Sequence, residues 1–505
     1  MKVLRSSQIK EVDAYTIENE PILSINLMER AARKCSRWIG RYFSKNFKFN
    51  VFVGPGNNGG DGLAVARQLA EDEREVKVFI VKISDKLSKD ANINLERLEK
   101  QNLVEITYLH KDDELPELSN KMVIIDAMFG SGLNRPLEGF PAEVVRYLNR
   151  FQATRIAIDI PSGLFGEDNS TNVPENIFNA DYTLTFQFPK LSFFFPENEG
   201  FVGQWYALDI GLSQTKIEEV ESPYFLISEH YVKKHIAKRK RFAHKGHFGH
   251  PLLINGSYGK MGAAILAAKA ALKTGSGLVT VHLPVSGYSI MQTAVPEAML
   301  SIDISELIFS KIPDISRFSN IGGGCGIDTK VNTQKALKEL IEKEERPLVL
   351  DADALNILAV NPEWLGQLPE KSILTPHPKE FDRLAGDSPN HFKRIQQQRD
   401  FASKYGVIVV LKGGNTSVAM PNGICFFNIN GNPGMSTAGS GDVLTGIITS
   451  LVGQGYQPHI AALTGVYLHG LAGDIASEEN SQEAVIATDI INALGKAFKK
   501  VKSGC

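Results

Sequence analysis

Short apolar runs alternate with amphipathic stretches along the first two hundred residues. The runs are rich in Val, Ile and Phe, and stretches with helical spacing, such as residues 62–69, separate them. Buried parallel strands with helices between them give this pattern, which is typical of a doubly wound sheet. The predicted strands are residues 49–53, 76–81, 122–125 and 155–158, and the pattern closes at residues 205–212.

A second alternation follows a polar segment at residues 213–223, which we interpret as a linker. The length of 505 residues also favours two domains, because a single core rarely grows so large. We therefore predict an α/β protein with a Rossmann-like domain at residues 1–212 and a second α/β domain at residues 223–505. In the second domain the predicted strands are residues 252–254, 278–281, 347–350, 373–374 and 407–411, and the predicted helices are residues 263–273 and 443–452.

Composition narrows the function classes. The formal net charge is -2, with 43% hydrophobic and 22% charged residues, which is typical of a globular enzyme or binding protein and gives no general case for nucleic acid or anionic membrane. Charged residues occur within residues 1–7, before the apolar stretch that a signal peptide would need. We therefore expect no signal peptide and a cytoplasmic location. The cysteines are scattered without metal-ligand or redox spacing, and we expect free thiols at Cys35, Cys325, Cys425 and Cys505.

Two conspicuous patterns do not change this picture. The basic run at residues 238–241 precedes a glycine-containing segment in an otherwise balanced domain, and we interpret it as a solvated or phosphate-facing loop. Glycine and proline interrupt the histidines at 244, 247 and 250, so these side chains do not share a helical face and predict no zinc site.

A glycine-rich loop near the C-terminus carries the clearest chemistry. Residues 437–442 read Thr-Ala-Gly-Ser-Gly-Asp and precede an apolar helical stretch. Free amides at a helix start attract a phosphate or a transition state that develops negative charge. A carboxylate would repel a bound phosphate, so Asp442 is predicted to be a general base. The alternative is that Asp442 only caps the helix.

Three loops after predicted strands of the first domain carry Asp or Asn among glycines. They read Gly-Pro-Gly-Asn-Asn-Gly-Gly-Asp-Gly at residues 54–62, Asp-Ala-Met-Phe-Gly-Ser-Gly-Leu at 126–133 and Asp-Ile-Pro-Ser-Gly-Leu at 159–164. Ligands bind at the carboxyl ends of strands in sheets of this type. Their convergence predicts a site for a phosphate, a hard cation, or both.

These loops, together with Leu-Met-Glu-Arg-Ala at residues 27–31, resemble those of the NAD(P)H-hydrate epimerase family. The second half is similar to the ADP/ATP-dependent NAD(P)H-hydrate dehydratases, which have a ribokinase-like fold. The resemblance covers nearly the whole chain, and it implies a bifunctional enzyme that repairs hydrated nicotinamide cofactors. One domain would interconvert the R and S hydrates, and the other would dehydrate the S form with ADP. Two alternatives are a ribokinase-type small-molecule kinase joined to a nucleotide-binding module and a non-catalytic nucleotide sensor.

For the first domain the resemblance implies a potassium ion held by Asn58, Asp126 and Ser162, which all offer the oxygen ligands that a hard cation prefers. We further predict Asp159 as the acid/base near the inverted carbon; alternatively, it only binds backbone amides of the turn at Ser162 and Gly163. The residues expected to embrace the hydrated NADH or NADPH are Asn57, Asn58, Gly59, Gly60, Asp61, Gly130, Ser131, Gly132, Leu133, Asn134, Arg135, Pro136 and Asp159.

For the second domain the resemblance places the hydrate against Ala263, Gly326, His377 and Asp442. It places the nucleotide along Lys412, Gly413, Gly414, Asn415, Thr416 and Gly441. Lys412 ends an apolar strand and can neutralise phosphate charge, although such a lysine is often only solvated. His377 lies between two prolines and can hydrogen-bond the substrate; alternatively, it is a structural turn residue.

Some expectations remain open at this level. Gly-Gly-Gly-Cys-Gly at residues 322–326 departs from the usual Gly-Pro-Gly-Leu-Gly of the family, and we expect the backbone of this loop to keep its role. We expect magnesium as the counterion of the nucleotide without assigning protein ligands. Asp351 and Asp353 are the nearby candidates, but capping of the helix at residues 354–358 is the preferred interpretation. We expect a homo-oligomer.

Overall fold

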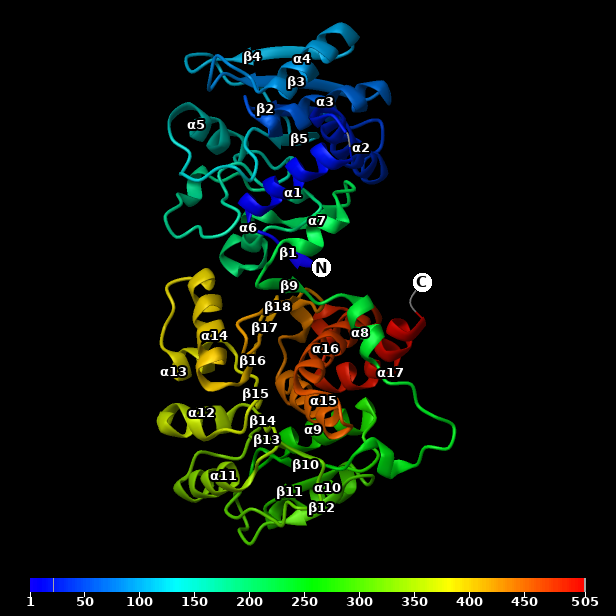
Figure 1. The fold of residues 1–505 in the computed structure, drawn as a ribbon, viewed down its shortest axis with the longest axis vertical. Coiled ribbons are helices and arrows are strands. Elements are labelled where there is room, and N and C mark those ends of the chain that lie inside the picture. Colours follow the sequence, from blue (N-terminus) through cyan, green and yellow to red (C-terminus); the bar gives the residue numbers. More distant parts are fainter. Residues whose placement is uncertain (21, 504–505) are drawn as a thin grey trace. The chain divides into compact units, whose positions relative to one another are not determined.

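A computed structural model describes residues 1–20 and 22–503 (Figure 1). The chain forms two compact units. We call Lys2–Ser222 with Asn390–Phe392 the N-terminal unit, and Met1, Pro223–Pro389 and the chain from Lys393 onward the C-terminal unit. Within the described residues, no helix combines the length and the hydrophobicity that crossing a membrane requires.

The N-terminal unit contains a seven-stranded parallel sheet with strand order β4-β3-β2-β5-β6-β7-β8. Helices α2, α3 and α4 pack on one face, where Ile39, Leu69 and Leu98 are buried, and α5 covers the other face. Its elements are β1 (Lys2–Val3), α1 (Ser6–Asn19), α2 (Ser24–Tyr42), β2 (Lys48–Val53), α3 (Asn57–Glu71), β3 (Glu75–Val81), α4 (Lys89–Gln101), β4 (Glu105–Leu109), β5 (Met122–Ala127), α5 (Gly139–Leu148), β6 (Thr154–Ile158), β7 (Tyr182–Phe186), α6 (Glu199–Val202), β8 (Gln204–Leu208) and α7 (Gln214–Glu219).

In the C-terminal unit the strands follow the order β9-β18-β17-β16-β15-β14-β13-β10-β11-β12, and β17 is antiparallel to both of its neighbours. One face packs against α9, α15, α16 and α17, and the other against α11, α12, α13 and α14. The elements are β9 (Tyr224–Leu226), α8 (Glu229–His235), β10 (Pro251–Ile254), α9 (Met261–Thr274), β11 (Thr280–Leu283), α10 (Tyr288–Ala294), β12 (Met299–Ile302), β13 (Asn320–Gly323), α11 (Val331–Lys343), β14 (Val349–Leu350), α12 (Asp353–Val360), β15 (Ile373–Leu374), α13 (Pro378–Ala385), α14 (His391–Tyr405), β16 (Ile408–Leu411), β17 (Thr416–Ala419), β18 (Cys425–Asn428), α15 (Ser440–Gly453), α16 (Pro458–Asn480) and α17 (Ala487–Ser503).

The polar segment predicted to be a linker is folded. Residues 214–219 form α7, and Ile217 and Val220 are buried against Leu4 and Val12 of the N-terminal unit. The break between the units falls between Ser222 and Pro223. A six-residue helix with one buried side chain is too short to give a readable periodicity, which explains the difference from the sequence interpretation.

Strand β13 was not predicted, because its last residues belong to the glycine run at 322–326. A Cβ atom on Gly322 would lie 2.0 Å from Oγ1 of Thr449, and one on Gly323 would lie 2.1 Å from the carbonyl oxygen of Ile254. Only glycine therefore allows this strand to lie so close to α15 and β10. The glycine run at residues 322–326 therefore allows close packing of a strand in addition to forming a loop.

Candidate active sites

The strand order brings the loops of the N-terminal unit together. Strand β2 pairs with β5 in a register that aligns Val53 with Ala127, and β6 lies on the far side of β5. The chain order reverses between β2 and β5, so the loops after these strands meet at a topological switch point. The loops that begin at Gly54, Asp126 and Asp159 consequently open at one edge of the sheet.

Asp126 is the centre of the first cluster. Its fully buried carboxylate accepts hydrogen bonds from Ser162 Oγ at 2.6 Å, from Ser162 N at 2.7 Å and from Met128 N at 3.1 Å. Burial raises the pKa of Asp126 to about 6, although these hydrogen bonds oppose the shift. The structure thus joins Asp126 and Ser162, as the potassium hypothesis requires.

Asn58 completes this cluster from the first turn of α3. Its Nδ2 donates to the carbonyl oxygen of Phe129 at 2.9 Å, and the amide of Phe129 donates to Ser162 Oγ at 2.9 Å. The Oδ1 atom of Asn58 is buried and has no hydrogen-bond partner within the described chain. A buried acceptor without a donor is rare and costly, and a cation would satisfy it. The oxygen set of Asn58, Asp126 and Ser162 fits a hard cation.

Asp159 follows β6 in the left-handed region, with φ of 67°. Its carboxylate accepts from Lys190 Nζ at 2.7 Å and from Ser131 N at 3.1 Å. Burial would raise the pKa of Asp159, but the charge of Lys190 and these hydrogen bonds hold it below the ordinary value. Asp159 is therefore ionised at neutral pH. The alternative that it only binds amides of the Ser162–Gly163 turn is wrong, because its bonds go elsewhere.

Lys190 is a site residue that the sequence did not reveal. Its side chain is 1% exposed, and Nζ also donates to Thr185 Oγ1 at 3.0 Å. Lysine is almost never fully buried unless it is paired. A lysine in an unremarkable Pro-Lys-Leu segment gives no local signal of burial, and only the fold shows that the residue reaches Asp159.

Two further carboxyl groups near Asp159 have raised pKa values. Burial, followed by the charge of Asp159, raises the pKa of Asp13 to about 6. The same causes, in the same order, raise the pKa of Asp61 well above its ordinary value. A lowered pKa at Asp159 and a raised pKa at Asp61 are the kind of separation that assigns one group as base and another as acid. Asp13 lies on α1 and was not predicted.

The glycines of residues 54–62 differ in the space that they leave for a side chain, and this difference allows the packing of the loop to be tested. A Cβ on Gly59 would lie 1.9 Å from the carbonyl oxygen of Gly54, whereas a Cβ on Gly56 would have no heavy atom within 4 Å. We expect Gly59→Ala to lower the free energy of unfolding by about 3 kcal/mol or more, since the backbone must move. Gly56→Ala is the matched control and should change it by less than about 1 kcal/mol. Urea denaturation of both variants measures the difference, and equal stabilities would contradict the packing described here.

In the C-terminal unit, Lys412 and Asp351 form the core of the second site. Lys412 Nζ lies 2.8 Å from Asp351 Oδ1, and Asp351 Oδ2 accepts from Thr445 Oγ1 at 2.8 Å. Burial would lower the pKa of Lys412, but Asp351 and Glu380 keep it above the ordinary value. Lys412 is therefore a charged, partnered lysine. The interpretation of Lys412 as merely solvated is wrong.

The preferred interpretation of Asp351 as a helix cap is also wrong. Helix α12 has Ala352 at its N-cap, without a side-chain capping bond, and the carboxylate of Asp351 points to Lys412 and Thr445. Asp353 begins the helix and accepts from Asp328 N at 3.0 Å and from Lys260 Nζ at 3.3 Å. Within the described chain, no group of three or more His, Cys, Asp or Glu side chains could hold a metal ion. A protein-held magnesium does not fit Asp351 while Lys412 occupies it.

Asp442 lies in the first turn of α15, beside this pair. Gly439, with φ of 89°, is the N-cap and carries no side-chain cap, so the interpretation of Asp442 as the capping residue is wrong. Burial raises the pKa of Asp442 to about 6; Asp351 adds to the shift, while the Cys325 thiol and Lys412 oppose it. A carboxyl group poised near neutrality at a helix start is suited to general base catalysis.

The remaining predicted residues gather around Asp442 and Lys412. A Cβ on Gly441 would lie 3.2 Å from Lys412 Nζ, and one on Gly326 would lie 3.4 Å from Cβ of Ala263. Gly413 and Gly414 have open space beside them, and Thr416 Oγ1 donates to the carbonyl oxygen of Gly413 at 3.1 Å. Gly413 and Gly414 therefore leave space beside the backbone, and contact of this loop with a nucleotide stays a prediction.

His377 has a structural role in the observed fold. Its Nδ1 accepts from Glu380 N at 3.3 Å, and Glu380 Oε2 accepts from His377 N at 2.8 Å, which forms a capping box for α13. Glu380 also lies 3.9 Å from Lys412 Nζ. His377 thus has a structural role, as the alternative for it held, although it caps α13 and is not a simple turn residue; contact with the substrate stays a prediction.

His469 is a second residue that the sequence did not reveal. It lies on α16, and its Nε2 is 3.3 Å from Oγ of Ser440 in the glycine-rich loop. Burial lowers the pKa of His469 to about 4, so the ring is neutral and can orient the Ser440 hydroxyl. Only the packing of α16 against α15 brings it to the loop.

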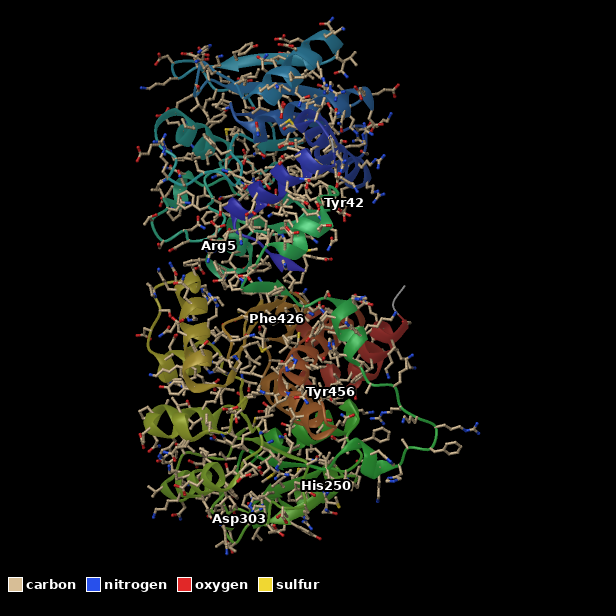
Figure 2. The ribbon with its side chains drawn as sticks, viewed as in Figure 1. Arg5, Tyr42, His250, Asp303, Phe426 and Tyr456 are labelled. Atoms are coloured by element: carbon tan, nitrogen blue, oxygen red, sulfur yellow. The ribbon has the colours of Figure 1, made fainter. Side chains whose placement is uncertain are left out.

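Several background expectations have clear outcomes. Cys35, Cys325 and Cys425 are buried free thiols, and Cys505 lies outside the described residues. Cys325 occupies the glycine run, where burial, with the charges of Asp351 and Asp442, raises the pKa of its thiol well above the ordinary value. His250, labelled in Figure 2, contacts Thr280 Oγ1 at 2.8 Å through Nε2.

The fold and the two sites define a two-unit α/β enzyme with one strand-end site in each unit. A family model described as "YjeF-related protein N-terminus" matches residues 24–192, and one described as "NAD(P)H-hydrate dehydratase" matches residues 251–496. The chain belongs to the family of bifunctional NAD(P)H-hydrate repair enzymes.

Relatives described as bifunctional NAD(P)H-hydrate repair enzymes support this assignment along most or all of the chain. The bifunctional NAD(P)H-hydrate repair enzyme of Moorella thermoacetica is 36% identical over 99% of this chain and 97% of its own length, and that of Thermofilum pendens is 35% identical over the same shares. The Escherichia coli enzyme is 31% identical over 88% of this chain and 84% of its own. A solved ADP/ATP-dependent NAD(P)H-hydrate dehydratase from Bacillus subtilis is 27% identical, with a TM-score of 0.49, over 55% of this chain and 98% of its own.

Proposed function

We propose that this chain repairs hydrated NADH and NADPH in two steps at two separate sites. The site at Asn58, Asp126 and Asp159 would interconvert the R and S hydrates, and the site at Lys412 and Asp442 would dehydrate the S form with ADP. The chain belongs to the repair-enzyme family, and each of its units holds a carboxylate with a shifted pKa at the carboxyl edge of its sheet. These carboxylates, Asp159 and Asp442, are the observation that carries the proposal.

For dehydration, Asp442 would remove the proton from the substrate hydroxyl. The freed oxygen would attack the terminal phosphorus of ADP, and AMP would leave with the electrons of the broken P–O bond. The amides of Gly439–Gly441 and the charge of Lys412 would stabilise the transferring phosphoryl group. The ring nitrogen would then expel phosphate, and loss of a proton from the neighbouring carbon would restore the double bond. Magnesium would accompany the nucleotide as its counterion.

Epimerisation would use the ionised Asp159 as the base and a neutral carboxyl such as Asp61 as the acid. Lys190 would keep Asp159 charged. Potassium, when bound by Asn58, Asp126 and Ser162, would supply a fixed positive charge beside the phosphates of the substrate. The residues of the 57–61 and 130–136 loops would orient the ribose and phosphates through backbone amides.

An absorbance assay tests the proposed function. The full chain should regain dihydronicotinamide absorbance from hydrated NADH when ADP is added. A stable phosphorylated product without regained absorbance would favour the small-molecule kinase instead. If the chain gave neither product, a nucleotide sensor would be favoured.

The potassium proposal makes a prediction of its own. Replacing K⁺ by N-methylglucamine should lower the rate of epimerisation at least ~10-fold, because the buried oxygens of Asn58, Asp126 and Ser162 would lose their counterion. Dehydration of purified S hydrate by the same sample is the control and should keep its rate, provided that the nucleotide and magnesium are unchanged. Asp126→Ala should remove the dependence on K⁺. Epimerisation at full rate without K⁺ would contradict the assignment.

The pKa of Asp442 predicts the pH dependence of dehydration. Below a pKa of about 6 the carboxyl is protonated and cannot accept a proton, so kcat/KM should fall about tenfold per pH unit below that value. Above it the carboxylate is formed and kcat/KM should level off. Initial rates with S hydrate between pH 5 and 8 measure this profile. A profile that fell as the pH rose through 6 would exclude Asp442 as the base.

A further inference from the structure

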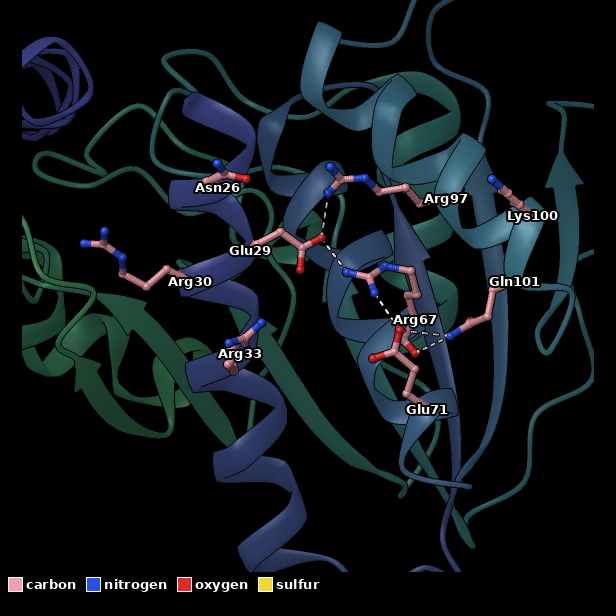
Figure 3. Close-up of a pocket in the computed structure, with 9 residues that line it drawn as sticks. All are labelled: Asn26, Glu29, Arg30, Arg33, Arg67, Glu71, Arg97, Lys100 and Gln101. Atoms are coloured by element: carbon pink, nitrogen blue, oxygen red, sulfur yellow. Dashed lines mark hydrogen bonds and ion pairs between the residues drawn. The ribbon is translucent and has the colours of Figure 1, made fainter. Parts of the chain in front are cut away.

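We propose that a pocket between α2, α3 and α4 of the N-terminal unit binds a small anion with two or more phosphate groups. The cavity has a volume of about 730 Å³, which is within the usual range for small-molecule sites. Its walls carry five basic, two acidic and two amide side chains (Figure 3). None of them belongs to the residues proposed for epimerisation, which lie at the opposite end of α3.

One carboxylate organises the basic side chains. Glu29 on α2, whose side chain is 16% exposed, pairs with Arg67 on α3 and accepts from Arg97 on α4 at 2.9 Å. Arg67 Nη1 also lies 2.7 Å from Glu71 Oε1. The guanidinium groups of Arg67 and Arg97 are thus held in place at the pocket. Arg97 uses one of its five N–H donors to bind Glu29, which leaves the others available to a ligand.

The other basic side chains leave the pocket with excess positive charge. Arg33 on α2 and Lys100 on α4 are exposed, and neither has an ion pair within the described residues. Arg30 donates to the carbonyl oxygens of Ile210 and Gly211, and its Nη1 also lies 3.7 Å from Oε2 of the half-exposed Glu20. Figure 3 shows that all three helices contribute a cation, with Arg33, Arg67 and Lys100 as examples. Glu29 and Glu71 of the pocket, together with Glu20 beside Arg30, do not balance the five cations, so the cavity attracts anions.

The identity of the side chains favours phosphate. Arginine presents a planar fork of donors that matches phosphate oxygens in pairs, and four of the five cations are arginines. Cations on three helices around one cavity suit an anion with several charged groups. The net charge of -2 for the whole chain provides no broad field for a nucleic acid, so we assign a small molecule such as pyrophosphate or a nucleotide.

Titration of the full chain with inorganic pyrophosphate in a calorimeter tests the pocket. Arg33→Gln with Lys100→Gln removes two exposed cations that form no ion pair among the described residues, so folding should be unaffected. Lys111→Gln with Lys121→Gln makes the same charge change at exposed positions away from the pocket. The first pair should weaken one set of pyrophosphate sites at least ~10-fold, and the control pair should not. ADP-dependent dehydration should be equal in both.

Three results would overturn the proposal. The first is equal pyrophosphate affinity in the pocket variant and the control. The second is that all binding disappears with Lys412→Gln, which would place it in the nucleotide site alone. The third is a changed oligomer mass in the pocket variant without a change in pyrophosphate binding, which would show that the cations contact another copy of the chain.

Discussion

Asp442→Asn should lower the rate at which the S hydrate of NADH is dehydrated at least ~100-fold while ADP still binds, since the amide has the shape of the carboxylate but cannot take a proton. The rate of absorbance regain from S hydrate measures the loss. ADP affinity should hold because Lys412 and the amides of Gly439–Gly441 are untouched.

The matched control for this variant is Asp400→Asn, which changes an exposed aspartate on α14 with no ion pair among the described residues. It should dehydrate at the rate of the unmodified chain. Dehydration by Asp442→Asn near that rate would remove Asp442 from the mechanism. Loss of ADP binding as well would indicate a disturbed loop in place of a missing base.

Asp159→Asn should lower the rate of R and S interconversion at least ~100-fold and leave dehydration of S hydrate unchanged. The physical reason is that the ionised carboxylate is the predicted base and its pKa is held low by Lys190. Chiral chromatography of the hydrates follows the interconversion, and the dehydration rate of the same sample reports on the integrity of the rest of the chain.

This variant leaves Lys190 as an unpaired cation, 1% exposed, which can cost about 3–5 kcal/mol of stability. The double variant Asp159→Asn with Lys190→Met removes both charges and should recover stability without recovering epimerisation. If epimerisation returned with stability, Asp159 would be a structural partner of Lys190 and the base would lie elsewhere.

The strands that the sequence predicted are those with continuous apolar runs, such as β2, β3 and β16. Buried parallel strands contact helices on both faces, so their composition alone identifies them. Strand β13 was missed because close packing against Thr449 and Ile254 requires glycine, which usually indicates a loop. Edge strand β4 was missed because its side chains are partly exposed.

The residues of the two candidate sites also divide into those that the sequence predicted and those that it missed. The convergence of the loops that carry Asn58, Asp126 and Ser162 could be predicted because each loop follows a strand and has an unusual glycine content, whereas the ligand set came from the family resemblance and stays a prediction. Lys190 and His469 could not, because they reach their partners from elements without any motif. Asp351 was misassigned because a carboxylate before a helix is usually a cap, whereas Lys412 here comes from another strand. The expected oligomer stays a prediction.

The central claim is that two separate sites divide the work, and a mixing experiment tests it most directly. A mixture of R and S hydrates with ADP is given to the full chain with Asp159→Asn, which should consume only the S form and then stop. Adding the full chain with Asp442→Asn should let the reaction run to completion, because each variant supplies the site that the other lacks. The account would be wrong if Asp159→Asn alone consumed both epimers at the rate of the unmodified chain. It would also be wrong if the mixed variants consumed only the S form and left the R form unchanged.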